Sequence, residues 1–184
     1  RIWDPTTATT ITTLKGHTSP VRTMAWSPNG THLATASNDR TIRITSTAML
    51  ALTPIPSGPS QDGADDTTSP AGVSISSEAT WITSVMFSPD GSTLAYVGRT
   101  DGKPRLSLRK LSEREPVAIP GTDGAASPFF SPDGRWVAFF AQGQLQKAEV
   151  AGGAPVRIVD AAYAQGGTWN EDDTIIFAAS LGSG

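Results

Sequence analysis

One turn sequence occurs three times in this chain, as Ser27-Pro28-Asn29-Gly30, Ser88-Pro89-Asp90-Gly91 and Ser131-Pro132-Asp133-Gly134. A divergent fourth copy is Asn170-Glu171-Asp172-Asp173. Proline presets φ at the first central position of a turn, asparagine or aspartate bonds to the nearby backbone, and glycine accepts a positive φ. Each copy lies between two short apolar runs, such as 21–26 and 32–36 around the first. The pattern predicts four hairpins, each made of a strand, a tight turn and a strand.

The later copies of the turn recur about every 40 residues, a period that is typical of propeller blades with four short strands each. Helical repeats of that length would need amphipathic stretches of about 10–15 residues, and we find none of good length. We therefore predict an all-β fold, a β-propeller of four-stranded antiparallel blades. Three blades are expected to be complete or nearly so. The first has strands at 21–27, 32–37, 41–46 and 72–76, and the second has strands at 82–88, 93–99, 105–111 and 116–120. The third has strands at 126–131, 136–141, 144–150 and 155–160.

The interval between the first two turns is longer than the others. The additional residues of this interval fall at 49–71, a segment rich in proline, glycine and aspartate. This composition predicts a mobile insertion between the third and fourth strands of the first blade. The insertion is either a loop that binds a partner or a tolerated surface insertion.

The two ends of the chain complement each other. Residues 1–4 and 10–14 are expected to be outer strands, and residues 167–170 and 174–180 are expected to be inner strands. Together they would make one further blade, split between the termini. Three arrangements remain open: a closed four-bladed ring, an excerpt of a larger propeller, and two copies that form an eight-bladed ring as a homodimer. We favour the excerpt, because the chain opens on Arg1 rather than on methionine.

Composition excludes several classes of protein. The 184 residues suffice for one well-cored domain, and we treat 1–184 as a single propeller region. With 38% hydrophobic residues, 17% charged residues and a net charge of −3, nothing favours binding to nucleic acid. The absence of cysteine excludes disulfides and cysteine-ligated metals. No apolar run approaches the roughly 20 residues of a membrane helix, so we expect no direct membrane insertion in this segment.

A further set of motifs lies in residues 1–46: Ile2-Trp3-Asp4, Gly16-His17, Trp26-Ser27-Pro28-Asn29-Gly30, Leu33-Ala34-Thr35-Ala36-Ser37, Asp39 and Thr41-Ile42-Arg43-Ile44. This set resembles a WD repeat. The resemblance implies a buried hydrogen-bond network of His17, Ser37 or Thr35, and Asp39, and we assign Ser37 to it. The tryptophan that completes the network in the family is replaced here by Thr45, so the implied network is incomplete.

Residues 82–180 carry a second set: Pro128-Phe129-Phe130-Ser131-Pro132-Asp133-Gly134-Arg135-Trp136, Gly152-Gly153-Ala154-Pro155-Val156 and Gly166-Gly167-Thr168-Trp169. These motifs resemble TolB-like repeats, which occur in periplasmic proteins, in peptidase-associated propellers and in bacterial serine/threonine kinases. The kinase-linked version is the most similar, and it implies a propeller on the periplasmic side of a bacterial cell. The chain itself has neither a Gly-rich phosphate loop nor a His-Arg-Asp catalytic loop.

We predict no catalytic site, no metal and no cofactor. His17 is explained by the implied network, His32 directly follows a turn, and the chain lacks a Gly-x-Ser-x-Gly elbow. Two acidic groups fit solvated loops better than a metal site, with weak calcium binding as the alternative. They are Asp62, Asp65 and Asp66, and Glu171, Asp172 and Asp173.

Candidate interaction residues gather on the second blade. Trp81 lies in the connection that precedes it, in the register that His17 occupies before the first blade. Trp81 is predicted either to be exposed as a hot spot or to plug the space between blades. Arg99, Arg105 and Arg109 belong to a cationic group that also includes Lys103, Lys110 and Arg114. Strand alternation puts Arg105 and Arg109 on one face, which is either a solvated outer face or a basic patch for an acidic partner.

The fold and the resemblances together indicate a non-catalytic scaffold that binds another protein or senses a small ligand. Its implied setting is the sensor part of a bacterial membrane kinase. The alternative is a propeller accessory domain of a serine peptidase or hydrolase whose catalytic domain is not in this chain. Both functional expectations rest on analogy of fold.

Overall fold

The computed structural model describes residues 1–49, 73–76, 81–113, 115–164 and 166–178. These residues form antiparallel strands and one short 3-10 helix, η1 (Thr47–Met49). The predicted insertion at 49–71 lies, apart from residue 49, outside the described residues.

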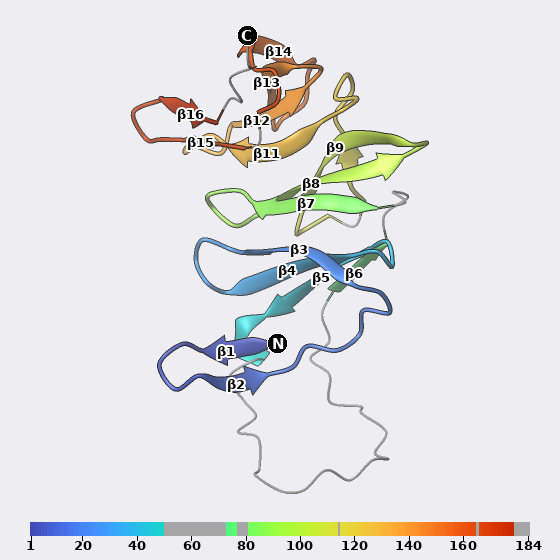
Figure 1. The fold of residues 1–184 in the computed structure, drawn as a ribbon, viewed down its shortest axis with the longest axis vertical. Helices are drawn as coiled ribbons and strands as arrows, with labels where there is room; N and C mark the ends of the chain where they lie inside the picture. The colour runs from blue at the N-terminus through green and yellow to red at the C-terminus, as the bar shows by residue number, and fades with distance from the viewer. Residues whose placement is uncertain (50–72, 77–80, 114, 165, 179–184) are drawn as a thin grey trace, which may run out of the picture.

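Three four-stranded sheets make up the centre of the molecule (Figure 1). In each sheet the strands pair in chain order. The first sheet contains β3 (Val21–Trp26), β4 (His32–Ser37), β5 (Thr41–Ser46) and β6 (Val73–Ser76). The second contains β7 (Ile82–Phe87), β8 (Thr93–Thr100), β9 (Lys103–Lys110) and β10 (Val117–Ala118). The third contains β11 (Ala126–Phe130), β12 (Trp136–Ala141), β13 (Gln144–Glu149) and β14 (Val156–Asp160).

The sheets stack face to face along the chain, as propeller blades do. The first strand of each sheet contacts the first strand of the next, β3 with β7 and β7 with β11. These first strands therefore line the inner side of the stack. The expected strand at 72–76 is present as β6, which pairs with β5, so the four-stranded antiparallel prediction is confirmed for all three sheets.

Two hairpins complete the stack, one at each end (Figure 1). They are β1 (Ile2–Asp4) with β2 (Thr9–Thr12), and β15 (Gly167–Trp169) with β16 (Ile175–Phe177). The N-terminal pair precedes β3 as an outer half, and the C-terminal pair follows β14 as an inner half. Among the described residues no strand pairing joins the two halves into one blade. Three sheets separate them, and the stack does not turn far enough to bring its ends together.

Each repeated turn closes on a buried serine hydroxyl. In the second copy the Ser88 hydroxyl donates to the Asp90 carboxylate and accepts the Thr93 N–H at 2.9 Å. The Gly91 N–H donates to the Ser88 carbonyl at 2.8 Å, and Gly91 has a φ of 72°, which glycine adopts without a steric cost. The first and third copies repeat these bonds. The sequence pattern therefore encodes one hydrogen-bonded turn, used three times.

Neighbouring turns also pack on each other. A Cβ atom added to Gly91 would lie 3.5 Å from the side-chain amide nitrogen of Asn29 in the preceding turn. A Cβ added to Gly134 would lie 3.6 Å from the Cδ atom of Pro89. The turns thus form a continuous row along one edge of the stack.

Apolar side chains fill the spaces between successive sheets. One cluster joins the first and second sheets through residues such as Ile42 and Leu94, and another joins the second and third through Leu106 and Phe139. A third cluster packs β15–β16 on the third sheet around Phe140. The second strand of each full sheet is buried on both faces, which explains its nearly uniform apolar sequence.

The serine of the turn is predicted to stabilise the fold through its hydroxyl. Ser88→Ala leaves the Thr93 N–H without its acceptor in a buried position, so it is expected to cost about 1–3 kcal/mol of unfolding free energy. Urea unfolding measures the loss. Ser112→Ala, at an exposed position in a neighbouring loop, is the matched control and should change the free energy little. Equal effects of both variants would contradict the role assigned to the hydroxyl.

Acid should weaken the same turn. Hydrogen bonds from the Ser88 hydroxyl and then from Ser92 lower the pKa of Asp90 from 3.8 to about 2. Because the folded-state pKa is depressed, this stabilisation is present above about pH 4 and is lost as the pH falls towards 2. Urea unfolding of the wild type and of Asp90→Asn, compared at several pH values, should show a difference that shrinks across this window. A difference that is independent of pH would contradict the prediction.

Candidate functional site

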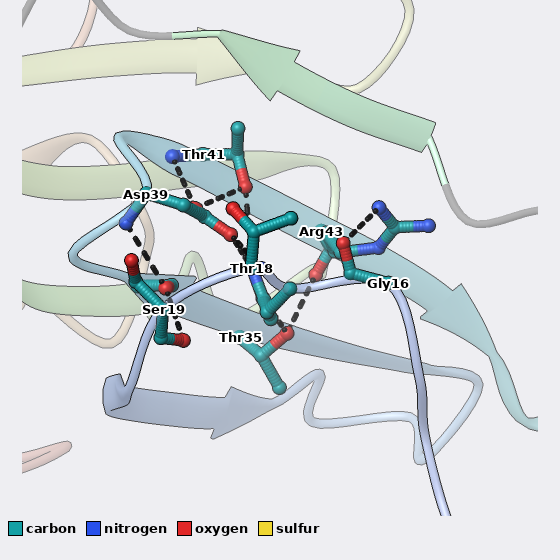
Figure 2. A network of polar contacts seen from close by, with 9 residues as sticks. Gly16, Thr18, Ser19, Thr35, Asp39, Thr41 and Arg43 are labelled. Atoms are coloured by element: carbon teal, nitrogen blue, oxygen red, sulfur yellow. Dashed lines mark hydrogen bonds and ion pairs between the residues drawn. The ribbon is translucent and has the colours of Figure 1, made fainter.

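A network of polar side chains centres on His17, in the connection between β2 and β3. Figure 2 shows its members Thr35, Asp39 and Thr41. Its Nδ1 atom lies 2.9 Å from an Asp39 carboxylate oxygen, and its Nε2 atom lies 2.9 Å from the Thr35 hydroxyl. Asp39 also accepts the Thr18 N–H at 2.9 Å and the Thr41 hydroxyl at 2.6 Å. The network thus ties the connection before the sheet to β4, to the β4–β5 turn and to β5.

The Asp39 carboxylate is held in its charged form. Burial alone would raise its pKa, but hydrogen bonds from the Thr41 hydroxyl, His17 and the backbone N–H groups of Thr18 and Thr41 outweigh burial and hold the pKa far below its usual range. Each of these partners sits in the same sheet or in its leading connection. The arrangement therefore locks the blade rather than presenting a reactive group to solvent.

The structure corrects one member of the predicted network. The hydroxyl that forms a hydrogen bond with His17 Nε2 is that of Thr35, not that of Ser37. Ser37 instead donates to the Ser19 carbonyl at 2.8 Å and accepts the Asp39 N–H at 3.1 Å. Thr35 and Ser37 share one face of β4, so alternation allows either residue, and only the reach of the imidazole ring along the strand decides between them.

Trp81 lies on the surface, at the edge of the sheets opposite the repeated turns. We call this edge the loop edge; it comprises 14–20, 38–40, 81 and 101–102. The Trp81 side chain is 51% exposed, and the guanidinium carbon of Arg99 lies 5.8 Å from its ring centroid. Its carbonyl accepts the Arg99 N–H, as the Pro20 carbonyl accepts the Asn38 N–H in the first sheet. Trp81 therefore occupies the register of Pro20, not that of His17.

Two residues that sequence reasoning did not connect with Trp81 adjoin it. Arg22 and Asn38 line a hollow of about 460 Å³ together with Trp81, Ile82 and Thr83. The Arg22 Nε atom donates to the Asn38 side-chain oxygen at 3.0 Å, which orients the guanidinium. No sequence motif links Arg22 to Trp81, because they belong to neighbouring sheets.

Arg105 and Arg109 do not form the predicted patch. Arg109 lies opposite Leu94, in the core between the first two sheets, and is only 6% exposed. Its Nε atom donates to the Glu113 carbonyl at 3.1 Å. Arg105 donates to Asp123 at 2.7 Å, and that pairing lowers the pKa of the Asp123 carboxyl.

Other cations of the group are likewise paired. Lys103 also contacts Asp123, at 3.4 Å, and Lys110 contacts Glu113 at 3.0 Å. Arg114 lies outside the described residues. The basic patch predicted for the second sheet is therefore largely neutralised by local carboxylates.

The other residues considered for catalysis or metal binding make hydrogen bonds that stabilise local structure. The Nδ1 atom of His32 lies 2.8 Å from the hydroxyl of the adjacent Thr31. Asp172 accepts the Thr174 N–H, and Asp173 accepts the Trp169 indole N–H at 2.7 Å, so both serve the last turn. Asp62, Asp65 and Asp66 lie outside the described residues. In the described segments no three His, Cys, Asp or Glu side chains gather as metal ligands, and no helix has the length and apolar character of a membrane span.

Comparison with known proteins shows that two segments of the chain are similar to a known type of repeat. Residues 8–46 and 73–106 match the family model described as WD domain, G-beta repeat. The search of curated proteins found no match. The two matched segments include the His17 network and the Trp81–Arg99 pair.

Two solved structures show the architecture. A chain of the mitotic checkpoint complex superposes with a TM-score of 0.73 at 14% identity, covering 98% of this chain and 51% of that one. A protein described as TolB from Agrobacterium tumefaciens superposes with a TM-score of 0.65 at 19% identity, covering 88% of this chain and 55% of that one. At these identities the likeness shows the fold alone, a β-propeller. The chain spans about half the length of both structures.

The His17 network makes a testable contribution to stability. His17→Ala removes one hydrogen-bond partner from the buried Asp39 carboxylate and one from the Thr35 hydroxyl, and it is expected to lower the free energy of unfolding by about 1–3 kcal/mol. His32→Ala is the matched control, because the side chain of His32 bonds only to its neighbour Thr31 among the contacts described above. Chemical denaturation of the three proteins checks the ranking. An unchanged free energy of unfolding in His17→Ala would contradict the structural role assigned to His17.

Proposed function

We propose that this propeller is a non-catalytic scaffold that binds a partner protein through the loop edge around Trp81. The observation that carries the proposal is the half-exposed indole ring of Trp81, held against Arg99 and beside the oriented Arg22. Tryptophan and arginine are the residues most enriched at binding hot spots. WD propellers are generally non-catalytic scaffolds for protein–protein interaction, which supports the same assignment.

The chemistry of the loop edge suggests the kind of partner. Arg99 already stacks on Trp81, so the aromatic surface and a positive charge are presented together. Arg22 adds a second guanidinium at the rim of the same hollow. An acidic segment with an apolar side chain would bury the indole ring and pair with both guanidinium groups.

The setting of the scaffold is a separate part of the proposal. The similarity of residues 128–140 to kinase-linked TolB-like repeats supports a ligand sensor of a bacterial membrane kinase, on the periplasmic side. That location rests on resemblance alone. The second candidate is an accessory propeller of a serine peptidase or hydrolase, supported by the wider TolB-like resemblance. Sequence that flanks this segment separates the two, through a kinase domain and membrane span or through a nucleophile elbow.

A homodimer is a further part of what we propose about the partners of this chain. The homodimer through blade completion concerns the two terminal hairpins rather than the loop edge. A scaffold could therefore dimerise and keep the Trp81 surface accessible.

Selection of a random peptide library on the immobilised protein tests the loop edge. Selected peptides are expected to be acidic, and Trp81→Ala and Arg99→Ala should each weaken their binding by about tenfold or more. Fluorescence anisotropy with one labelled peptide measures the dissociation constants. Tyr163→Ala removes an exposed aromatic ring elsewhere and should leave the affinity unchanged. Peptides that bind all three variants equally well would place the binding surface elsewhere.

A further inference from the structure

A hollow of about 510 Å³ lies between the second and third sheets, and we call it the interblade hollow. Leu108 and Val117, which lie opposite each other on β9 and β10, line one wall. Val150, at the end of β13, lines the other wall. Both sheets have all four strands, and each is packed between two neighbours along the stack. The shape of the interblade hollow therefore follows from the packing of two complete sheets.

Small residues in the third sheet leave this space open. The connection from β13 to β14 reads Ala151-Gly152-Gly153-Ala154, and a Cβ atom added to Gly152 would meet nothing within 4 Å. No side chain of the connection extends beyond a methyl group. Val117 is consequently 63% exposed, although it shares the face of Leu108 that is turned toward the third sheet.

The preceding gap, between the first and second sheets, is filled at the corresponding position. By the pairing of the strands, Ala148 on β13 holds the place that Arg109 holds on β9. The Arg109 side chain is buried in that gap and reaches the Glu113 carbonyl. Ala148 is too short to reach across the equivalent space. The difference in side-chain length explains why a hollow forms at one interface and not at the other.

The rim of the interblade hollow carries two cations, Lys110 and Arg135. The Lys110 Nζ atom lies 3.0 Å from a carboxylate oxygen of Glu113, so its charge is balanced. Within the described part of the chain the Arg135 guanidinium takes part in no ion pair. The adjacent Asp133 carboxylate instead accepts the Ser131 hydroxyl and the Arg135 backbone N–H. One positive charge at the rim is therefore left without a bound carboxylate.

The remaining carboxylate of the lining, Glu149, belongs to the opposite face of the third sheet. Glu149 lies opposite Trp136, and Lys147 places its Nζ atom 4.3 Å from the centroid of the Trp136 ring. Lys147 also lies over Trp169 of β15, so this face is turned toward the last hairpin. Because side chains two residues apart share a face, the Glu149 carboxylate points away from the interblade hollow. The charge that faces the interblade hollow is thus net positive.

From the apolar walls and the unpaired guanidinium we infer that the interblade hollow binds a small amphipathic carboxylate. The apolar body of the ligand lies between Leu108 and Val150, and its carboxylate accepts hydrogen bonds from Arg135. Arginine presents two parallel N–H groups that match a carboxylate, and the volume is in the range of small-molecule sites. This inference goes beyond the proposed function and does not rest on it, because Trp81 lies at the loop edge and does not line the interblade hollow.

Isothermal titration calorimetry with three eight-carbon probes of matched length tests the ligand class. Octanoate is expected to bind with a dissociation constant in the millimolar range or below. Octanamide should bind about tenfold more weakly, because a neutral amide forms no charge-assisted pair, and octylamine should bind more weakly still. Equal affinity for octanoate and octanamide, preference for the amine, or no binding of octanoate at millimolar concentration would overturn the inference.

Three variants locate the site. Arg135→Gln should lower the affinity for octanoate to that for octanamide and leave the affinity for octanamide unchanged. Arg157→Gln is the matched control, because it removes the same charge from an exposed position on β14 that does not line the interblade hollow. Val117→Trp fills the space and should weaken both probes. Circular dichroism verifies that each variant is folded. An effect of Arg157→Gln as large as that of Arg135→Gln, or full binding by Val117→Trp, would contradict the site.

A fourth variant separates this site from the loop edge. Trp81→Ala, which is expected to weaken peptide binding, should leave the affinity for octanoate unchanged. In NMR spectra of the wild type, octanoate should shift the backbone amide signals of Leu108, Val150 and Gly152. Signals that shift at 81–83 instead, or a loss of octanoate binding in Trp81→Ala, would place the carboxylate at the loop edge and overturn the inference.

Discussion

A buried serine hydroxyl closes the turn between the first two strands in each complete blade, and the rest of the fold depends on that closure. The hydroxyl of Ser88 bonds both to Asp90 and to the N–H of Thr93, so these buried polar groups find their partners within the turn itself. The same turn sets the register of the two innermost strands, and neighbouring turns touch along one edge. Packing between blades therefore starts from three local structures that share the same hydrogen bonds.

The opposite edge of the blades is organised differently. In the first blade the His17 network joins the entering chain to two strands, and it keeps the Asp39 carboxylate charged despite burial. The second blade has Trp81 and Arg99 at this edge instead. One edge of the molecule is thus repetitive and structural, whereas the loop edge varies from blade to blade. Variation on a rigid frame is the physical basis on which we propose that a specific partner binds at the loop edge.

Packing between neighbouring blades stabilises each of them. A blade is stable because both of its faces are covered, and in the part of the chain that the structure describes β3 and β16 each leave one face bare at Trp26 and Ile176. Burying such residues contributes about 25 cal/mol per Å² of apolar surface, which is the driving force for stacking one blade on the next.

Local chemistry made much of the fold predictable. The Ser-Pro-Asx-Gly turns located the hairpins, because turn geometry depends on few adjacent residues. The spacing predicted a strand at 72–76, which the structure shows as β6 (Val73–Ser76). Resemblance placed His17 beside Asp39, but the choice of Thr35 over Ser37 needed the imidazole position. Alternation put Arg105 and Arg109 on one face, yet only tertiary packing buried Arg109 and bound Arg105 to Asp123. The sequence by itself determined which residues share a strand and a face, whereas the stacking of blades decided what covers each face, because that contact joins segments far apart in the chain.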